Sequence, residues 1–181
     1  MSDEEKNIQD ARFPAGKFSR KEDYSPEEMN GFINDFSLLP ERLKKLVDSA
    51  TAADLNRSYR PGGWTMAQVV HHVSDSHMNF LIRMKLALTE DVPIIKPYAE
   101  NKWAETAEYT PDDLADSVMI IEAVHRKIIK ILKNLSEDDL KKSFYHPENK
   151  KHFTIKQVTA LYSWHFRHHI GHIERCLETV K

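Results

Sequence analysis

Histidine is the residue type with which this sequence could most readily do chemistry. The segment WHFRHHIGHIE, residues 164–174, holds His165, His168, His169 and His172. At about 100° per residue, all four fall within an arc of roughly 100° on one face of a helix. Histidines four residues apart present imidazoles one turn apart, as in zinc-binding H-x-x-x-H helices. Two such pairs occur, His165 with His169 and His168 with His172, and spacing alone does not choose between them.

A second group of histidines lies in HHVSDSH, which contains His71, His72 and His77. A catalytic zinc usually takes three protein ligands and a water, so a helix with two ligands needs a third from elsewhere. Facing helices of a bundle commonly supply ligands jointly. The helical wheel places His77 near the middle of the apolar stripe, His72 at its edge and His71 on the polar side. Periodicity therefore favours His77 as the inward-facing histidine.

The other titratable candidates are isolated in the sequence. His125 is predicted to lie on a helix surface, and His146 and His152 are predicted to lie in a loop. Cys176 follows His172 by one helical turn, and it fits a small buried hydrophobic residue better than an activated thiol.

Composition limits the class of protein. The 181 residues carry a net charge of −2, with acids and bases interspersed, so neither nucleic acid nor an anionic membrane is an expected partner. No apolar run approaches the roughly 20 residues that a membrane span needs, and no signal peptide is visible. The single cysteine favours a reducing compartment, so a cytoplasmic protein is expected.

Four long amphipathic helices must position these residues. They are expected over residues 24–50, 65–90 and 110–135, and from about residue 154 to the C-terminus. Ser25, Thr65 and Ser136 are predicted to cap helical segments, and Pro40 is predicted to kink or divide the first helix. Residues 91–103 form an irregular crossover, and residues 144–153 form a loop or a small hairpin. The predicted fold class is an all-α four-helix bundle with long crossovers, one domain over 1–181 with an extended arm at 1–23.

Several longer motifs resemble a known family. YRPGGWT, QVVHHVSDSHMNFLIRMKLALTE, IKPYAENKWAE, FYHP and LYSWHFRHHIGHI together resemble the YfiT group of the DinB-like superfamily, described as metal-dependent hydrolases. The resemblance runs from about Tyr59 to the C-terminus and more weakly over the first helix. It implies the DinB/YfiT-like type of four-helix bundle.

The resemblance also implies a ligand set. In that family three histidines hold the metal, and the matching positions are His72 in HVSD and the pair His165 and His169, the latter because Gly171 matches a glycine common in relatives. This choice overrides the wheel preference for His77 and leaves the roles of His77, His168 and His172 open. It further implies one Zn²⁺ or Ni²⁺ per subunit and a cytoplasmic homodimer.

Such a site supports more than one function. Hydrolysis of a small-molecule substrate by a metal-bound water is the leading hypothesis. The first alternative is a metal-dependent thiol S-transferase using a low-molecular-weight thiol such as bacillithiol, because some relatives in the superfamily use one. The second is a non-catalytic metal-binding stress-response protein.

Some further residues are candidates for assisting roles. Asp75 could orient a ligand or act as a base, since it lies three residues after His72. Arg60, Lys96 and Tyr98 could contact an anionic substrate. The three tryptophans are expected to wall the pocket or fill the core; they are Trp64, Trp103 and Trp164.

Overall fold

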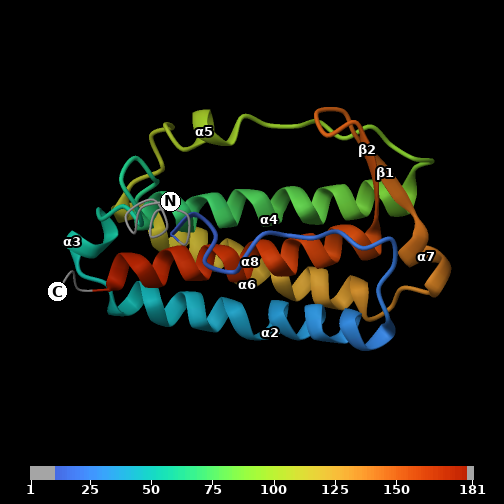
Figure 1. Cartoon of the computed structure of the whole chain (residues 1–181), viewed down its shortest axis with the longest axis horizontal. Helices are drawn as coiled ribbons and strands as arrows, with labels where there is room; N and C mark the ends of the chain where they lie inside the picture. Colours follow the sequence, from blue (N-terminus) through green and yellow to red (C-terminus); the bar gives the residue numbers. More distant parts are fainter. Residues whose placement is uncertain (1–10, 179–181) are drawn as a thin grey trace, which may run out of the picture.

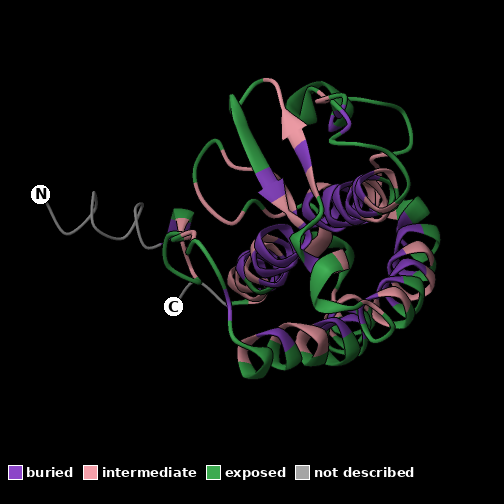
Figure 2. Ribbon diagram, turned by 90° about the vertical axis from the view of Figure 1, so that its right-hand side faces the viewer, coloured by how far each residue is buried: buried purple, intermediate pink, exposed green. Residues whose placement is uncertain are grey.

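Four long helices packed side by side form the body of the computed structural model, which describes residues 11–178 (Figure 1). They are α2 (Pro26–Ser49), α4 (Met66–Thr89), α6 (Leu114–Leu132) and α8 (Ile155–Leu177). Helices α6 and α8 each contact both α2 and α4, so the order around the bundle is α2, α6, α4, α8. Seen from the end, buried residues face the interior and exposed residues face outward (Figure 2). The predicted four-helix bundle is confirmed.

Side-chain caps fix where three of these helices begin. Ser25, Thr65 and Thr154 each accept a hydrogen bond from the backbone N–H three residues later, and the side chain at that later position bonds back to the cap. Such reciprocal caps satisfy backbone donors that a helix start leaves unpaired. The cap predicted at Ser136 is also present, before α7 (Glu137–Lys141).

Proline 40 does not divide the first helix, so that part of the prediction is wrong. Helix α2 continues through Pro40 as a single element. Because proline has no N–H, the carbonyl of Phe36 lacks its usual partner one turn later. The Nδ1 of His125 on α6 lies 3.1 Å from that carbonyl oxygen and supplies the missing donor.

Two histidines predicted to face solvent are buried. His125 is 1% exposed and His71 is 3% exposed. His71 Nδ1 lies 2.8 Å from Ser117 Oγ, and its Nε2 lies 2.9 Å from the carbonyl oxygen of Thr110. Both predictions are wrong because a helical wheel describes an isolated helix and does not include the helices that pack against its other faces. In the bundle, α6 covers a second face of α4, and α2 covers the side of α6 that carries His125.

The connections cover one side of α4. Residues 90–110 run over it and include α5 (Glu100–Trp103), before the short helix η1 (Pro111–Asp113); α3 (Ala52–Leu55) lies in the preceding connection (Figure 1). The predicted hairpin is present as β1 (Ser143–His146) paired antiparallel with β2 (Lys151–Thr154). His146 and His152 therefore lie in strands and not in a loop. Backbone bonds of Tyr145 with Pro93 and Ile95 join the hairpin to the crossover.

The N-terminal segment lies along α8. Residues 1–10 of the predicted arm lie outside the described residues, and residues 13–23 follow an irregular path across the helix (Figure 1). Trp164 Nε1 donates to the carbonyl of Gly16, and Gln157 Nε2 donates to the carbonyls of Lys21 and Glu22. A Cβ at Gly171 would lie 2.7 Å from Pro14, so this glycine permits the close approach. Within residues 11–178, no helix is long and apolar enough to cross a membrane.

The buried face of α2 gives a test of this packing. Phe36 is fully buried, whereas Leu38 on the same helix is 58% exposed. We expect Phe36→Ala to lower the free energy of unfolding by about 3–5 kcal/mol, because it leaves a cavity. Leu38→Ala should change it by less than about 0.5 kcal/mol. Urea unfolding followed by circular dichroism measures both, and equal losses would contradict the orientation of α2.

Candidate metal centre

Three histidines from two helices meet at one point in the bundle. One ring nitrogen of each of His72, His165 and His169 lies within 4.8 Å of the other two. The Nε2 atoms of His72 and His165 are 3.2 Å apart. His72 and His169 are buried and His165 is partly buried. Among the described residues, no other group of three His, Cys, Asp or Glu side chains is arranged to hold a metal ion.

The spacing of these nitrogens fits a divalent metal ion. Two imidazole nitrogens that bind one tetrahedral zinc at 2.0–2.1 Å lie about 3.3 Å from each other. The distance of 3.2 Å between the two Nε2 atoms agrees with that value. The Nδ1 atoms of His72 and His165 are buried without a partner, so hydrogen bonding within the described residues does not fully account for these rings. Three imidazoles are a donor set that suits zinc and nickel.

Burial keeps the three imidazoles neutral. It lowers the pKa of His72 to about 4, and it lowers the pKa values of His165 and His169 well below the usual 6.5. Each ring therefore presents a nitrogen lone pair at neutral pH, as a metal ligand must.

The other two histidines of α8 support the cluster. His172 Nδ1 lies 3.2 Å from His169 Nδ1, which leaves Nε2 of His169 free to ligate. His172 stacks on Tyr59 with ring centroids 3.8 Å apart, and His168 stacks on Trp164 at 4.7 Å. A partner on the far nitrogen orients a ligating histidine, so His172 is placed to orient His169.

A line of hydrogen bonds runs from α2 toward the cluster. The carbonyl of Phe36 can only accept, so the proton of neutral His125 lies on Nδ1. His125 Nε2 is then an acceptor, and it receives the proton of His77 Nδ1 at 2.9 Å. His77 is fully buried, as its place on the apolar stripe predicts. Its Nδ1 is occupied by His125, and it is not a member of the three-histidine group.

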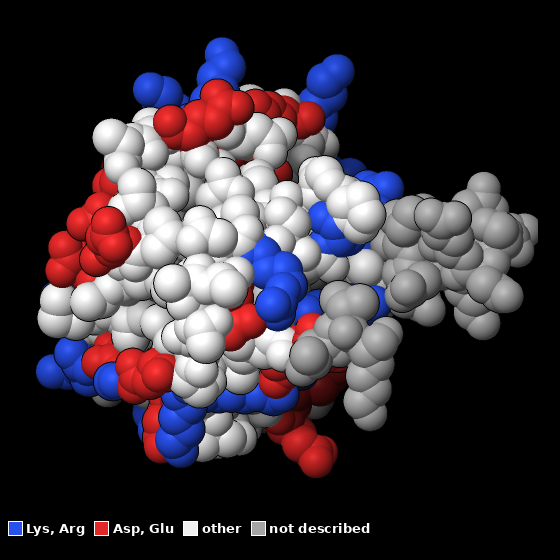
Figure 3. Space-filling view, turned by 90° about the vertical axis from the view of Figure 1, so that its left-hand side faces the viewer, with Lys and Arg blue, Asp and Glu red and all other residues white. Residues whose placement is uncertain are grey.

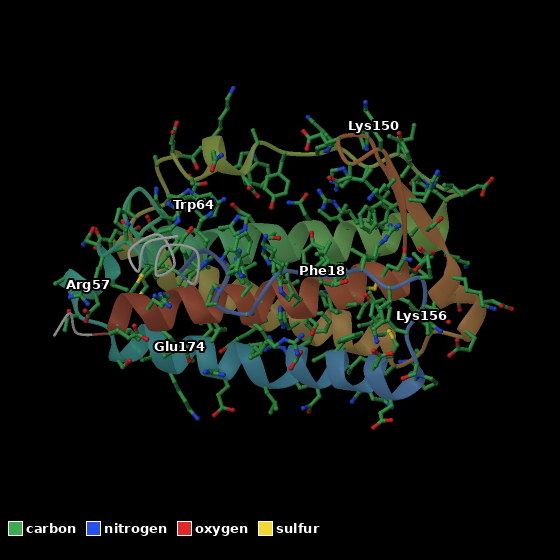
Figure 4. All side chains as sticks on the ribbon, in the orientation of Figure 1. Phe18, Arg57, Trp64, Lys150, Lys156 and Glu174 are labelled. Carbon is green, nitrogen blue, oxygen red and sulfur yellow. The ribbon has the colours of Figure 1, made fainter. Side chains whose placement is uncertain are left out.

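Two cavities meet at the cluster. The larger, about 540 Å³, lies between α4, α8, the crossover and the hairpin, and its lining includes Ser76, Arg83, Tyr98 and Tyr162. The smaller, about 370 Å³, contains all three clustered histidines. Three residues line both cavities: His165, Glu100 and Asn101. Figure 4 shows Trp64, which lines the smaller cavity, beneath the crossover and beside α4.

The structure separates the assisting candidates. Tyr98 lines the larger cavity and Arg60 lines the smaller one, whereas Lys96 is exposed and lines neither. Asp75 lies in a different cavity beside α6, where it accepts a hydrogen bond from Tyr109, and burial raises the pKa of its carboxyl. It is not brought to the cluster.

Two of the three tryptophans and the cysteine lie in their expected environments. Trp64 and Trp164 line the smaller cavity, as expected. The expectation is wrong for Trp103, which is 37% exposed, lines neither cavity and packs on Tyr98 with ring centroids 4.4 Å apart. Cys176 belongs to the apolar core, and burial raises the pKa of its thiol to about 11. The thiol is therefore protonated at neutral pH, as expected of a small buried hydrophobic residue.

Sequence reasoning missed Arg83 and Tyr162. Arg83 is only 8% exposed, and its NH1 donates to the hydroxyl of Tyr162 at 3.2 Å. A signal was present, because Arg83 follows His72 by about three helical turns and so shares its face of α4.

Charges on the end face near the chain termini are mixed. Figure 3 shows Lys and Arg side chains interspersed with Asp and Glu there. This face presents no broad field of one sign that would steer a highly charged polymer.

Comparisons with known proteins place this geometry in a family. The sequence pattern of the DinB superfamily matches residues 35–173. The Bacillus subtilis protein named "Putative metal-dependent hydrolase YfiT" is 39% identical over 161 residues, covering 89% of this chain and 90% of the relative. A similarly named protein of Oceanobacillus iheyensis is 41% identical over 163 residues, covering 90% of this chain and 93% of the relative.

Solved structures agree with the sequence matches. The structure of Bacillus subtilis YfiT, described as having an unusual four-helix bundle topology, matches with a TM-score of 0.89 at 38% identity, covering 92% of this chain and 95% of that one. The mycothiol-dependent maleylpyruvate isomerase matches with a TM-score of 0.53 at 15% identity, covering 80% of this chain and 60% of that one. The second match shows a shared fold alone.

The cluster predicts the metal content of the protein. We expect about one divalent ion per purified chain by elemental analysis, as for a three-histidine site. Alanine at His72, His165 or His169 should each remove most of it, whereas His152→Ala, on an exposed strand position, should not. Loss of metal in His77→Ala together with retention in His72→Ala would contradict the ligand set.

The buried pair His77–His125 predicts a pH dependence of stability. Burial lowers the pKa of His125 from 6.5 to about 4, so the unfolded chain takes up a proton that the folded chain refuses. Stability present above pH 6.5 is therefore lost as the pH falls toward 4, on the order of 2 kcal/mol from this residue at pH 5. Urea unfolding in the presence of a metal chelator measures this effect. Between pH 7 and pH 5, the free energy of unfolding should fall less for His125→Phe than for the unmodified protein or for His152→Phe. If the free energy of unfolding depended on pH in the same way in all three proteins, the predicted role of His125 would be wrong.

Proposed function

This chain belongs to the DinB superfamily and resembles its YfiT-type members, and from that membership we propose that it is a metal-dependent hydrolase acting on a small molecule. One observation carries the proposal. Three neutral imidazoles from α4 and α8 converge where two cavities meet, so a bound ion would be reachable by a substrate.

The residues around the cluster have separate tasks in this proposal. His72, His165 and His169 would hold the ion. A divalent ion held by neutral ligands polarises a carbonyl and lowers the pKa of coordinated water toward about 7. Glu100, the acidic residue that lines both cavities, is placed to accept the proton released during attack. Ser76, Tyr98 and Tyr162 offer hydroxyl groups to the substrate in the larger cavity.

We further propose Zn²⁺ or Ni²⁺ as the ion, one per subunit, and a homodimer in the cytoplasm. Three nitrogen donors support the choice of ion. The resemblance to the YfiT group supports the dimer and the compartment. Asp75 is no longer our candidate base, because Tyr109 binds it in a separate cavity.

Thiol transfer is the second candidate, and the pair of cavities favours it. A transferase must bring a thiol and an electrophile to the same point. The two cavities share His165, Glu100 and Asn101, so each could admit one reactant. A thiol taking the open position on the ion would lose its proton there, as metal-bound thiols do.

A substrate panel separates these functions. Amides and esters are offered to metal-loaded protein with and without a low-molecular-weight thiol. We expect hydrolysis without thiol, and a loss of at least about 100-fold in kcat/KM for His72→Ala and for Glu100→Gln. Glu148→Gln, an exposed acid that lines only the larger cavity, is the matched control.

Two other outcomes of the substrate panel would change the proposed function. Turnover that requires the thiol would replace hydrolysis by S-transfer. No turnover in either arm with metal-loaded protein would favour a metal-binding protein without catalytic activity.

A further inference from the structure

Arg83 is a buried cation without an acidic partner. Only 8% of the residue is exposed, and among the described residues no carboxylate lies within 4.0 Å of its guanidinium. Its Nε is buried and makes no hydrogen bond. Arginine stays charged in proteins. Glu100 and Glu148 line the same cavity, but neither forms an ion pair with this guanidinium, so its hydrogen-bonding fork has no carboxylate partner.

The two aromatic side chains that contact Arg83 carry no charge. NH1 donates to the hydroxyl of Tyr162, and the guanidinium lies 5.9 Å from the centre of the Tyr98 ring. Burial raises the pKa of both phenols, so both remain uncharged at neutral pH. An unpaired buried ion costs several kcal/mol, whereas a carboxylate bound to it would recover much of that cost.

The same cavity reaches the metal centre. His165 and Arg83 both line it, and Tyr162 precedes His165 by about one turn of α8. Arg83 follows His72 by about three turns of α4, so the cation and the cluster are separated along the cavity. In Figure 4 side chains of α4 and of the crossover project toward each other in this region.

We propose that the substrate is an organic carboxylate whose carboxylate group binds Arg83 while its reacting group lies at the three-histidine centre. A planar guanidinium pairs with a carboxylate through two parallel hydrogen bonds. Glu100 and Glu148 in the same lining would repel a doubly charged phosphate more strongly than a singly charged carboxylate. A spacer of several atoms must separate the two groups. This assignment of substrate class rests on the hydrolase proposal for the location of the reacting group.

Bifunctional ligands test this assignment. The monohydroxamates of the straight-chain dicarboxylic acids from succinic to suberic acid carry a metal-binding group at one end and a carboxylate at the other. Each is compared with its ω-carboxamide by calorimetry on zinc-loaded protein. At the best chain length we expect the carboxylate to bind about 10- to 100-fold more tightly, as charged hydrogen bonds allow. Arg83→Met should abolish that preference without weakening the carboxamide.

Three further variants serve as controls. Lys102→Met removes a cation from the mouth of the same cavity, and Lys85→Met removes an exposed cation from α4; both should keep the preference. Arg83→Lys keeps the charge without the fork and should retain only part of it. If circular dichroism shows that Arg83→Met does not fold, the comparison is made with Arg83→Lys instead.

The outcomes separate the two proposals. Hydroxamates that bind without any carboxylate preference would overturn the Arg83 assignment and leave the metal centre intact. If no hydroxamate binds, the proposed metal centre is wrong. The Arg83 assignment is then tested separately, by titrating the metal-free protein with adipate. Adipate binding that Arg83→Met abolishes supports the assignment, and no binding overturns it.

A second inference concerns the orientation of His165. His77 Nε2 and His165 Nδ1 are both buried without a partner, and their rings lie 5.6 Å apart. The hydrogen bonds from Phe36 through His125 leave His77 Nε2 as an acceptor. The structure contains no hydrogen bond between these two atoms. We infer that a small rotation of the two rings lets His165 Nδ1 donate its proton to His77 Nε2. The lone pair of His165 then lies on Nε2, the atom 3.2 Å from Nε2 of His72.

Proline 40 begins this line of contacts. It removes the N–H that would otherwise bind the carbonyl of Phe36, which leaves that carbonyl to fix the proton on His125 Nδ1. His77 and His125 thus act as positioning residues for His165, and neither of them binds the metal ion itself.

Zinc affinity and ¹⁵N NMR test the orientation. In metal-free protein the His165 resonances should report a proton on Nδ1. His77→Phe should mix the tautomers and weaken zinc binding by about 10- to 100-fold, as loss of an orienting partner does. His77→Gln, which offers an acceptor oxygen, should restore part of the affinity, and His152→Phe should change nothing. A proton on Nε2 of His165 in the unmodified protein, or unchanged affinity in His77→Phe, would overturn the inference.

Discussion

A buried imidazole that carries no charge needs a donor for one nitrogen and an acceptor for the other, and this need organises the centre of the bundle. Burial lowers the pKa values of His72, His165 and His169, so each must use its lone pair. The Nε2 atoms of His72 and His165 lie 3.2 Å apart, a separation that a shared metal ion satisfies when both atoms carry lone pairs.

The bundle meets this requirement through the order of its helices. Because α6 and α8 both lie between α2 and α4, α4 can present His72 to α8 while it presents His77 to His125 on α6. The crossover and the hairpin then cover the remaining side of α4 and enclose the larger cavity. The family resemblance is therefore expressed in two places, the three-histidine cluster and the long connections that enclose the larger cavity.

Local signals in the sequence predicted local structure well. The caps at Ser25 and Thr65 depend only on neighbouring residues, and the structure has both helix starts. The three clustered histidines came from motif resemblance, since periodicity alone pointed to His77. The wheel was right that His77 faces inward, but its partner His125 lies 48 residues away on another helix. Such pairings, and the burial of Arg83 by distant segments, depend on tertiary packing that helical spacing does not contain.

In our proposal, three imidazole nitrogens hold the ion. X-ray absorption at the metal edge of the purified protein measures this directly. We expect three imidazole nitrogens at about 2.0–2.1 Å from the metal, with oxygen or further nitrogen atoms as the remaining neighbours. The same spectrum of His72→Ala protein reloaded with metal should show one imidazole fewer. Sulfur at about 2.3 Å, or an unchanged imidazole count in that variant, would contradict the account.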